Sequence, residues 1–251
     1  MKKIDLNCDM GESYGAWKMG ADAEVMPFIT SANIACGFHA GDPATIRNTV
    51  RLAVDRGVAV GAHPSLPDLM GFGRRVMRIS PQEMYDLIIY QAGAVEAFAR
   101  VAGAKLHHVK CHGALYNMAV NDEALSEAMV RAVKDLGSGI MLYVLSRSKS
   151  FQIGQKAGLP VIGEVFADRG YADDGTLAPR DRPGGLIEDP AASVKQVLGM
   201  IEEGYVTSLS GKRVPVAADT LCLHGDQPGA VTFAQALRKV FTEKGITVAA
   251  P

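Results

Sequence analysis

The chain has 251 residues, of which 48% are hydrophobic and 21% are charged. Its 26 Lys and Arg residues nearly balance its 27 Asp and Glu residues, which gives a formal net charge of −1. A chain of this length can bury a core without disulfides or a structural metal, so we expect a single domain over residues 1–251. Because the charge is balanced and no cationic run occurs, we expect neither a nucleic-acid partner nor an anionic membrane partner.

The N-terminus and the cysteines favour a cytoplasmic protein. Asp5, Asp9 and Glu12 interrupt the apolar stretch that a signal peptide needs, and no segment approaches the roughly 18 consecutive apolar residues of a membrane span. The 4 cysteines lie far apart, with no CxxC pair. We therefore expect a reduced protein in the cytoplasm whose partner is a small molecule or another protein.

Short apolar runs alternate with longer amphipathic stretches along the chain, which is typical of β-α units around a parallel sheet. An Asp or Ser followed by Pro precedes three predicted helices, at residues 44–56, 82–103 and 191–203, as expected for capped helix starts. The predicted strands are residues 3–9, 31–37, 58–64, 107–113, 140–146, 160–166 and 220–226.

Three segments depart from this alternation. Residues 65–80 and 168–190 are long, polar and rich in Gly and Pro, and residues 205–218 are predicted to form a hairpin. Loops of such length in a compact domain are usually functional. No GxxxxGK[ST] phosphate-binding loop occurs, and the glycines of residues 71–75 do not form GxGxxG.

Polar residues gather where the predicted strands end, which is where β/α proteins place their chemistry. Side chains two apart share one face of a strand, so Asp5, Asn7 and Asp9 are expected to point together. Buried polar groups cost free energy unless they are paired, so we interpret the ensemble as a functional site. Its candidate members are Asn7, Asp9, Glu12, His39, His63, Lys110, His112, Asp168, Arg169, His224 and Asp226.

Four of these residues, Asp9, His39, His63 and His112, would suit a divalent metal ion, because imidazole and carboxylate groups are common metal ligands. No HExxH pattern supports that interpretation, and the same histidines would equally serve as general acids and bases or as hydrogen-bonding groups. The cysteines are expected to pack in the core.

Seven blocks of the sequence carry a family resemblance. They are DLNCDMGE (5–12), SANIACGFHAGDP (31–43), GAHPS (61–65), GFGRR (71–75), HGALYN (112–117), EVFADR (164–169) and LHGD (223–226). On these blocks the chain resembles the LamB/YcsF family along nearly its whole length. Residue 111, a cysteine where the family pattern has proline, lies on the opposite strand face from Lys110 and His112, so we expect it to change no chemistry. The resemblance implies an irregular seven-stranded β/α barrel similar to the glycoside hydrolase/deacetylase superfamily.

The resemblance also implies a reaction: ring opening of 5-oxoproline to L-glutamate, with hydrolysis of ATP to ADP and phosphate, together with the partner subunits PxpB and PxpC. Because no phosphate-binding loop is present, we expect the partners to hold ATP. A proton or a metal-bound water would be handled by Asp9 with His63 or His112, and anionic groups would bind Lys110 and Arg169. Catalysis is thus expected from Asp9, His63, Lys110 and His112, and substrate binding from Asn7, Glu12, Asn33, His39, Arg169, His224 and Asp226.

Two other functions fit the same residues. A metal-dependent amide hydrolase or deacetylase that acts alone would also use a rim of histidine and aspartate at the mouth of a barrel. A non-catalytic protein that only binds a small acid and delivers it to a partner enzyme would need fewer groups able to transfer protons.

Overall fold

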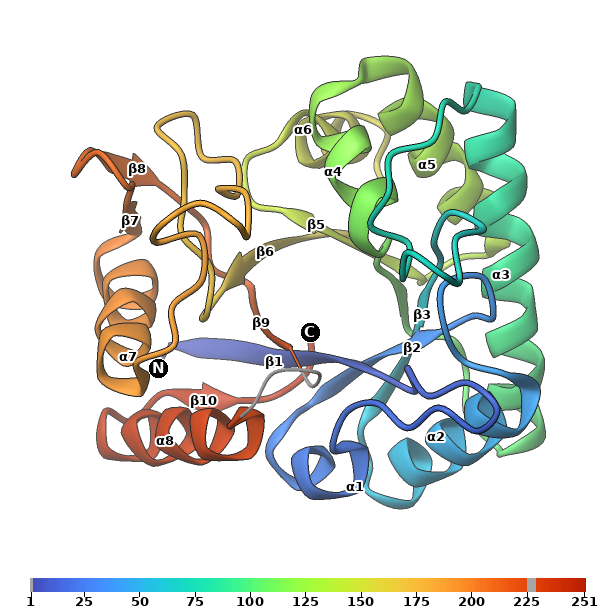
Figure 1. Ribbon diagram of the computed structural model, residues 1–251, viewed down its shortest axis with the longest axis horizontal. Coiled ribbons are helices and arrows are strands. Elements are labelled where there is room, and N and C mark those ends of the chain that lie inside the picture. The colour runs from blue at the N-terminus through green and yellow to red at the C-terminus, as the bar shows by residue number, and fades with distance from the viewer. Residues whose placement is uncertain (1, 225–228) are drawn as a thin grey trace.

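The computed structural model describes residues 2–224 and 229–251, which form a closed parallel β-barrel surrounded by helices (Figure 1). The sheet order is β10-β1-β2-β3-β4-β5-β6-β9, and a further pairing of β9 with β1 closes the ring. Without β10 (Thr247–Val248), which pairs with the start of β1, seven strands remain in the described barrel. These are β1 (Lys3–Met10), β2 (Ser31–Ala35), β3 (Ala59–His63), β4 (His108–Val109), β5 (Met141–Leu145), β6 (Val161–Phe166) and β9 (Thr220–His224).

Helices cover the outside of the barrel, as the alternating pattern predicts. Asp42 and Asp189 accept hydrogen bonds from backbone N–H groups at the starts of α2 and α7, and Ser80 with Glu83 forms a capping box at the start of α3. The helical elements are α1 (Asp22–Val25), η1 (Met26–Phe28), α2 (Pro43–Asp55), α3 (Pro81–Val101), α4 (Gly113–Asn121), α5 (Glu123–Leu136), α6 (Lys149–Lys156), α7 (Pro190–Leu198), η2 (Gly199–Glu203) and α8 (Ala230–Glu243). None of these described helices is long and apolar enough to cross a membrane.

The predicted loops are confirmed. Residues 65–80 and 168–189 form no helix and no named strand, and β7 (Tyr205–Thr207) pairs antiparallel with β8 (Arg213–Pro215) as a hairpin. β4 is shorter than the predicted strand of residues 107–113. Only His108 and Val109 pair with both neighbouring strands, and the chain then turns into α4 at Gly113, where φ is +55° and a Cβ atom would lie 2.6 Å from the Gly73 carbonyl oxygen.

The two faces of β1 divide the interior into an apolar layer and a polar barrel lumen. Ile4, Leu6, Cys8 and Met10 alternate with polar residues and belong to the hydrophobic core. On the other face, Asn7 and Asp9 accept hydrogen bonds from Lys110 Nζ, which comes from the end of β4, and this shows that the face looks across the barrel. The predicted common face of Asp5, Asn7 and Asp9 is therefore confirmed, and it leads to a pocket at the carboxyl ends of the strands.

Candidate active site

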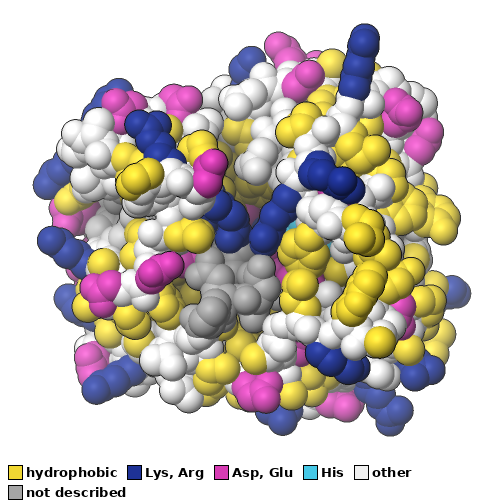
Figure 2. Space-filling model, viewed as in Figure 1, with side chains coloured by type: hydrophobic (Ala, Val, Ile, Leu, Met, Phe, Trp, Pro, Cys, Tyr) yellow, Lys and Arg dark blue, Asp and Glu magenta, His cyan; other side chains and the backbone are white. Residues whose placement is uncertain are grey.

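A cavity of about 520 Å³ opens at the carboxyl end of the barrel, within the usual size range for small-molecule sites. Its walls come from the ends of β1, β3 and β6, from α4, and from the long loops of residues 65–80 and 168–189. Figure 2 shows this face hollowed near its centre, with Lys and Arg side chains at the edge. The charged residues and histidines that line the cavity are Asp9, Glu12, His63, Arg74, Lys110, His112, Arg169, Arg180 and Asp181.

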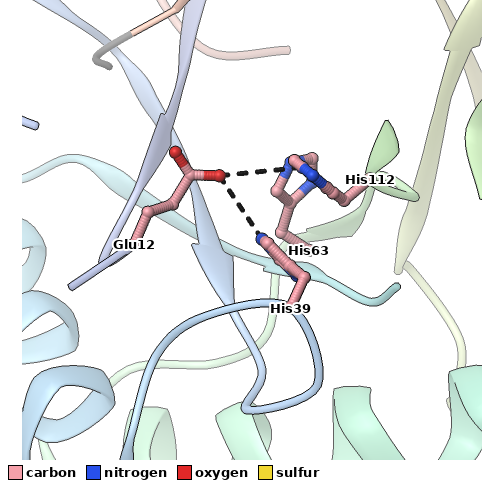
Figure 3. A group of neighbouring side chains, drawn as sticks. All are labelled: Glu12, His39, His63 and His112. Atoms are coloured by element: carbon pink, nitrogen blue, oxygen red, sulfur yellow. Dashed lines mark hydrogen bonds and ion pairs between the residues drawn. The ribbon is translucent and has the colours of Figure 1, made fainter. Parts of the chain in front are cut away.

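Four buried side chains form a cluster at the floor: Glu12, His39, His63 and His112, each offering a ligand atom within 4.8 Å of the others (Figure 3). Glu12 Oε1 lies 3.3 Å from His39 Nε2 and 3.6 Å from His112 Nδ1. The rings of His39 and His112 stack with centroids 3.8 Å apart. We call this group the His–Glu cluster.

Two rings of the His–Glu cluster have their tautomers set by backbone carbonyl groups. His63 Nδ1 lies 2.7 Å from the Lys110 carbonyl oxygen, and His112 Nε2 lies 2.8 Å from that of Phe72. A carbonyl oxygen only accepts, so both of these ring nitrogens carry protons, and His63 Nε2 and His112 Nδ1 present lone pairs when the rings are neutral. These two nitrogens are only 3.0 Å apart, so a positive charge is needed between them.

The charge that the cluster needs fits a divalent cation. Burial, together with the charge of His63, places the pKa of His39 well below its usual value, and burial with the neighbouring histidines does the same for His112. Both rings are therefore neutral and able to coordinate a metal. The carbonyl contacts of His63 and His112 match the outer-shell hydrogen bonds that orient metal-binding histidines, whereas His39 Nδ1 has no partner among the described residues. The donor set is thus a candidate metal site.

This set differs from the sequence-based expectation in one residue. The three histidines are as expected, but Glu12 takes the fourth position in place of Asp9. Asp9 lies beside the cluster, with Oδ2 3.3 Å from His63 Nε2, and its Oδ1 is held by Lys110 and Asn33. Glu12 can reach inward because the chain turns at Gly11, where φ is +68°, directly after β1.

Lys110 lies at the centre of a buried charge network. Its Nζ is 3.0 Å from Asp9 Oδ1, 2.7 Å from Glu164 Oε1, 3.1 Å from Asn7 Oδ1 and 3.0 Å from Cys222 Sγ. Burial by itself would lower the pKa of Lys110, but Asp9, Cys222 and Glu164 raise it well above its usual value. The ammonium group is therefore permanently charged and keeps a positive charge next to Asp9.

Two predicted substrate-binding residues lie below the pocket and do not line it. Asn33 Nδ2 donates to Asn7 Oδ1 (2.7 Å) and to Asp9 Oδ1 (2.8 Å), and Asn7 Nδ2 donates to Glu164 Oε1 (3.1 Å). His108, which was not a predicted site residue, donates from Nε2 to Asn33 Oδ1 over 2.7 Å. These hydrogen bonds fix the orientation of the Asp9 carboxylate, so its Oδ2 faces the His–Glu cluster.

Arg169 lines the cavity, and it also stabilises the loop of residues 168–189 through hydrogen bonds. Its Nε and Nη2 donate to the carbonyl oxygens of Gly185 and Ala178, at 3.1 and 2.6 Å. Burial and the nearby charge of Arg180 lower the pKa of Arg169 to about 10. The register of β9 sets His224 beside Asp9, but its side chain and Asp226 lie outside the described residues.

The structure adds residues that the sequence did not single out. Tyr116 Oη donates to Glu164 Oε2 over 2.7 Å, and both belong to the network around Lys110. All 4 cysteines are buried, as expected, but the position of Cys222 against Lys110 makes it part of the site's support. Glu164 could have been predicted as a site residue, because it lies on a predicted strand and points inward. Nothing in the sequence marks Tyr116, which lies on a helix, as a site residue.

Together, the parallel barrel and the strand-end pocket with its His–Glu cluster define a β/α-barrel protein with a candidate active site for a small molecule. The LamB/YcsF family model matches residues 4–251. The chain belongs to the LamB/YcsF family.

Full-length relatives carry one name. The chain is 56% identical to the A subunit of 5-oxoprolinase from Bordetella parapertussis over 98% of each chain. It is 54% identical to the A subunit of 5-oxoprolinase from Bacillus subtilis, over 100% of this chain and 97% of that protein.

Solved structures confirm the fold. The lactam utilization protein from Thermus thermophilus superposes with a TM-score of 0.93 at 48% identity, covering 99% of this chain and 100% of that one. A family 4 carbohydrate esterase from Streptomyces lividans superposes with a TM-score of 0.53 at 10% identity, covering 99% and 92%. The second similarity concerns the fold alone, and it agrees with the expected β/α barrel.

Proposed function

We propose that this chain is the lactam-opening subunit of an ATP-dependent 5-oxoprolinase, which converts 5-oxoproline, ATP and water to L-glutamate, ADP and phosphate. The observation that carries this proposal is the identity of 50–56% over nearly the full length to proteins named as the A subunit of 5-oxoprolinase. Because that name denotes one subunit of several, it supports the presence of partner subunits, which we take to be PxpB and PxpC. We assign ATP to these partners, because the chain has no GxxxxGK[ST] motif.

The reaction needs a group that takes a proton from water beside the lactam carbonyl, and Asp9 fits that role. Its Oδ1 is occupied by Asn33 and Lys110, so Oδ2 is the oxygen directed toward His63 and the pocket. Lys110 Nζ, 3.0 Å from Oδ1, places a positive charge beside this carboxylate, and a general base must carry no proton. Oδ2 lies 3.3 Å from His63 Nε2, so the base stands directly beside the His–Glu cluster.

The His–Glu cluster would hold a divalent metal ion through Glu12, His39, His63 and His112. Such an ion supplies Lewis acidity, which polarises a carbonyl oxygen and lowers the pKa of bound water. The protein's own part is to keep His39 and His112 neutral through burial, and to orient His63 and His112 through the carbonyl groups of Lys110 and Phe72.

Reconstitution tests this proposal. The partner subunits of the same organism, 5-oxoproline and Mg-ATP are mixed with and without this chain, and glutamate is measured. We expect glutamate only when the chain and the partners are both present. Glutamate formed without the chain would contradict the proposal, and amide hydrolysis by the chain alone without ATP would instead support a stand-alone amide hydrolase.

A further inference from the structure

The charges of the pocket are arranged from floor to mouth. The carboxylates of Asp9 and Glu12 lie at the floor, next to the His–Glu cluster, whereas Arg74 and Arg180 come from the two long loops around the opening. The two arginines attract a small anion to the mouth, where Asp181 also lines the cavity. A lactam acid whose carbonyl group faces the His–Glu cluster therefore has its carboxylate directed outward, toward these arginines.

The cations expected from the sequence to bind anions are engaged in holding the protein together. Lys110 has three N–H donors and four acceptors within 3.1 Å, all of them protein groups, so it has none to offer a ligand. Arg169 is buried, and it donates to the carbonyl oxygens of Ala178 and Gly185. It thereby anchors the loop at Ala178, two residues before Arg180.

Arg74 is positioned directly over the His–Glu cluster. Its guanidinium carbon lies 4.8 Å from the centre of the Phe72 ring, and that ring packs edge-on against His39 and His112. A Cβ atom at Gly113 would lie 3.6 Å from Arg74 Cγ, so the side chain passes over the start of α4. The neighbouring Arg75 is turned away, toward the buried carboxylate of Asp68.

Phe72 has the backbone conformation that this arrangement requires. Its φ is +53°, which is uncommon for an aromatic residue, and its carbonyl oxygen accepts the hydrogen bond from His112 Nε2. The same residue thus orients a cluster histidine through its backbone and supports Arg74 through its ring. Unfavourable backbone conformations of this kind concentrate at functional sites.

We propose that Arg74 and Arg180 bind the carboxylate of the lactam substrate at the mouth of the pocket, and so direct the lactam carbonyl toward the His–Glu cluster. This assignment rests on the proposed function. It transfers the anion-binding role from Lys110 and Arg169 to two loop residues, and it gives Arg169 the role of positioning Arg180.

The test is steady-state kinetics of the reconstituted enzyme with the variants Arg74→Gln and Arg180→Gln. Each is expected to raise KM for 5-oxoproline by about 10- to 100-fold with a smaller effect on kcat, because a charge-assisted hydrogen bond to the substrate is lost. The lysine variants at the same positions should recover part of the loss, since they keep the charge but not the bidentate geometry. Arg78→Gln and Arg182→Gln, exposed positions of the same loops, are the matched controls and should leave KM unchanged.

A ligand without the carboxylate gives the second readout. The inhibition constant of 2-pyrrolidinone should be the same for the wild type and for Arg74→Gln and Arg180→Gln. An unchanged KM for 5-oxoproline in either variant would overturn the assignment of that arginine, as would an equal weakening of 2-pyrrolidinone. Absence of glutamate with the wild-type chain would overturn the proposed function as well, which separates the two failures.

Discussion

His63 and His112 meet through ring nitrogens that both present lone pairs: Nε2 of His63 lies 3.0 Å from Nδ1 of His112, while the opposite nitrogen of each ring donates to a backbone carbonyl oxygen. Asp9 Oδ2 and Glu12 Oε1 add negative charge on the same side, at 3.3 Å from His63 and 3.6 Å from His112. Two ring nitrogens and two carboxylate oxygens that all present lone pairs repel one another, so this arrangement is stable only with a cation or a proton between them.

The first prediction is that the protein binds a divalent transition metal at this place. Titration of metal-free protein with Zn²⁺ or Mn²⁺, followed by calorimetry, should show one site, and Glu12→Gln or His112→Ala should weaken it by at least about 10- to 100-fold. His107→Gln is the control, because His107 lies outside the cluster. Equal affinity in the wild type and both cluster variants would contradict the assignment.

The second prediction concerns Gly73, in the loop above the cluster. Its φ is +63°, and a Cβ atom there would lie 2.1 Å from Ser65 Oγ and 2.9 Å from both His112 Cδ2 and His39 Cβ. Gly73→Ala should therefore displace the cluster and remove most of the metal binding and activity. Gly57→Ala is a matched control, because Gly57 has a φ of +66° with nothing within 4 Å. That variant should lose about 1 kcal/mol of stability but no activity; full activity in Gly73→Ala would refute the packing argument.

The third prediction concerns the buried network of Lys110. Lys110→Met leaves Asp9 and Glu164 without their buried counter-charge, so it should lower the free energy of unfolding by about 3–5 kcal/mol in urea titrations. Adding Glu164→Gln to this variant should restore part of the loss, because one uncompensated charge is removed. The exposed Lys105→Met should change stability by less than about 0.5 kcal/mol. A loss in Lys110→Met as small as that of the control would show that the network carries little stability.

The fourth prediction is a pH dependence that comes from His108. Burial, with the charges of His107 and Lys110, places the pKa of His108 well below its usual value of 6.5. The unfolded chain binds a proton here below about pH 6.5 while the folded protein does not, so acid favours unfolding. This group should remove up to about 1.4 kcal/mol of stability per pH unit below pH 6.5.

His108→Gln isolates that contribution. Urea unfolding of the wild type and the variant at pH 7 and pH 5 gives the acid loss of each protein, and the variant should lose less. The same acid loss in both proteins would mean that His108 takes up its proton equally well in the folded state.

Much of the fold could be predicted from the sequence, because it depends on local patterns. Alternating residues on β1 predicted the inward face of Asp5, Asn7 and Asp9, and the Ser80-Pro81 start of α3 has the capping box expected from its sequence. The strand of residues 107–113 was predicted too long, because its length is set by pairing across the barrel, where only His108 and Val109 pair with both neighbouring strands.

The site was predicted less completely, because partners across a barrel leave no local signal. Neither the place of Glu12 in the His–Glu cluster nor the full set of acceptors around Lys110 follows from strand periodicity. The anion-binding role expected of Lys110 depended on its charge, whereas its four protein contacts appear only when the strands are brought together. Arg180 lies in an irregular loop, where no period marks which side chains face the pocket.

The measurement that tests the central claim most directly is the rate of glutamate formation by the reconstituted enzyme containing Asp9→Asn. This variant keeps the size of the side chain but removes the base, and Asp55→Asn, at the exposed end of α2, is the control. If the lactam is opened in this pocket, the rate should fall by about 10²- to 10⁴-fold in Asp9→Asn and stay unchanged in the control. Turnover near that of the wild type in a folded Asp9→Asn enzyme would contradict the account.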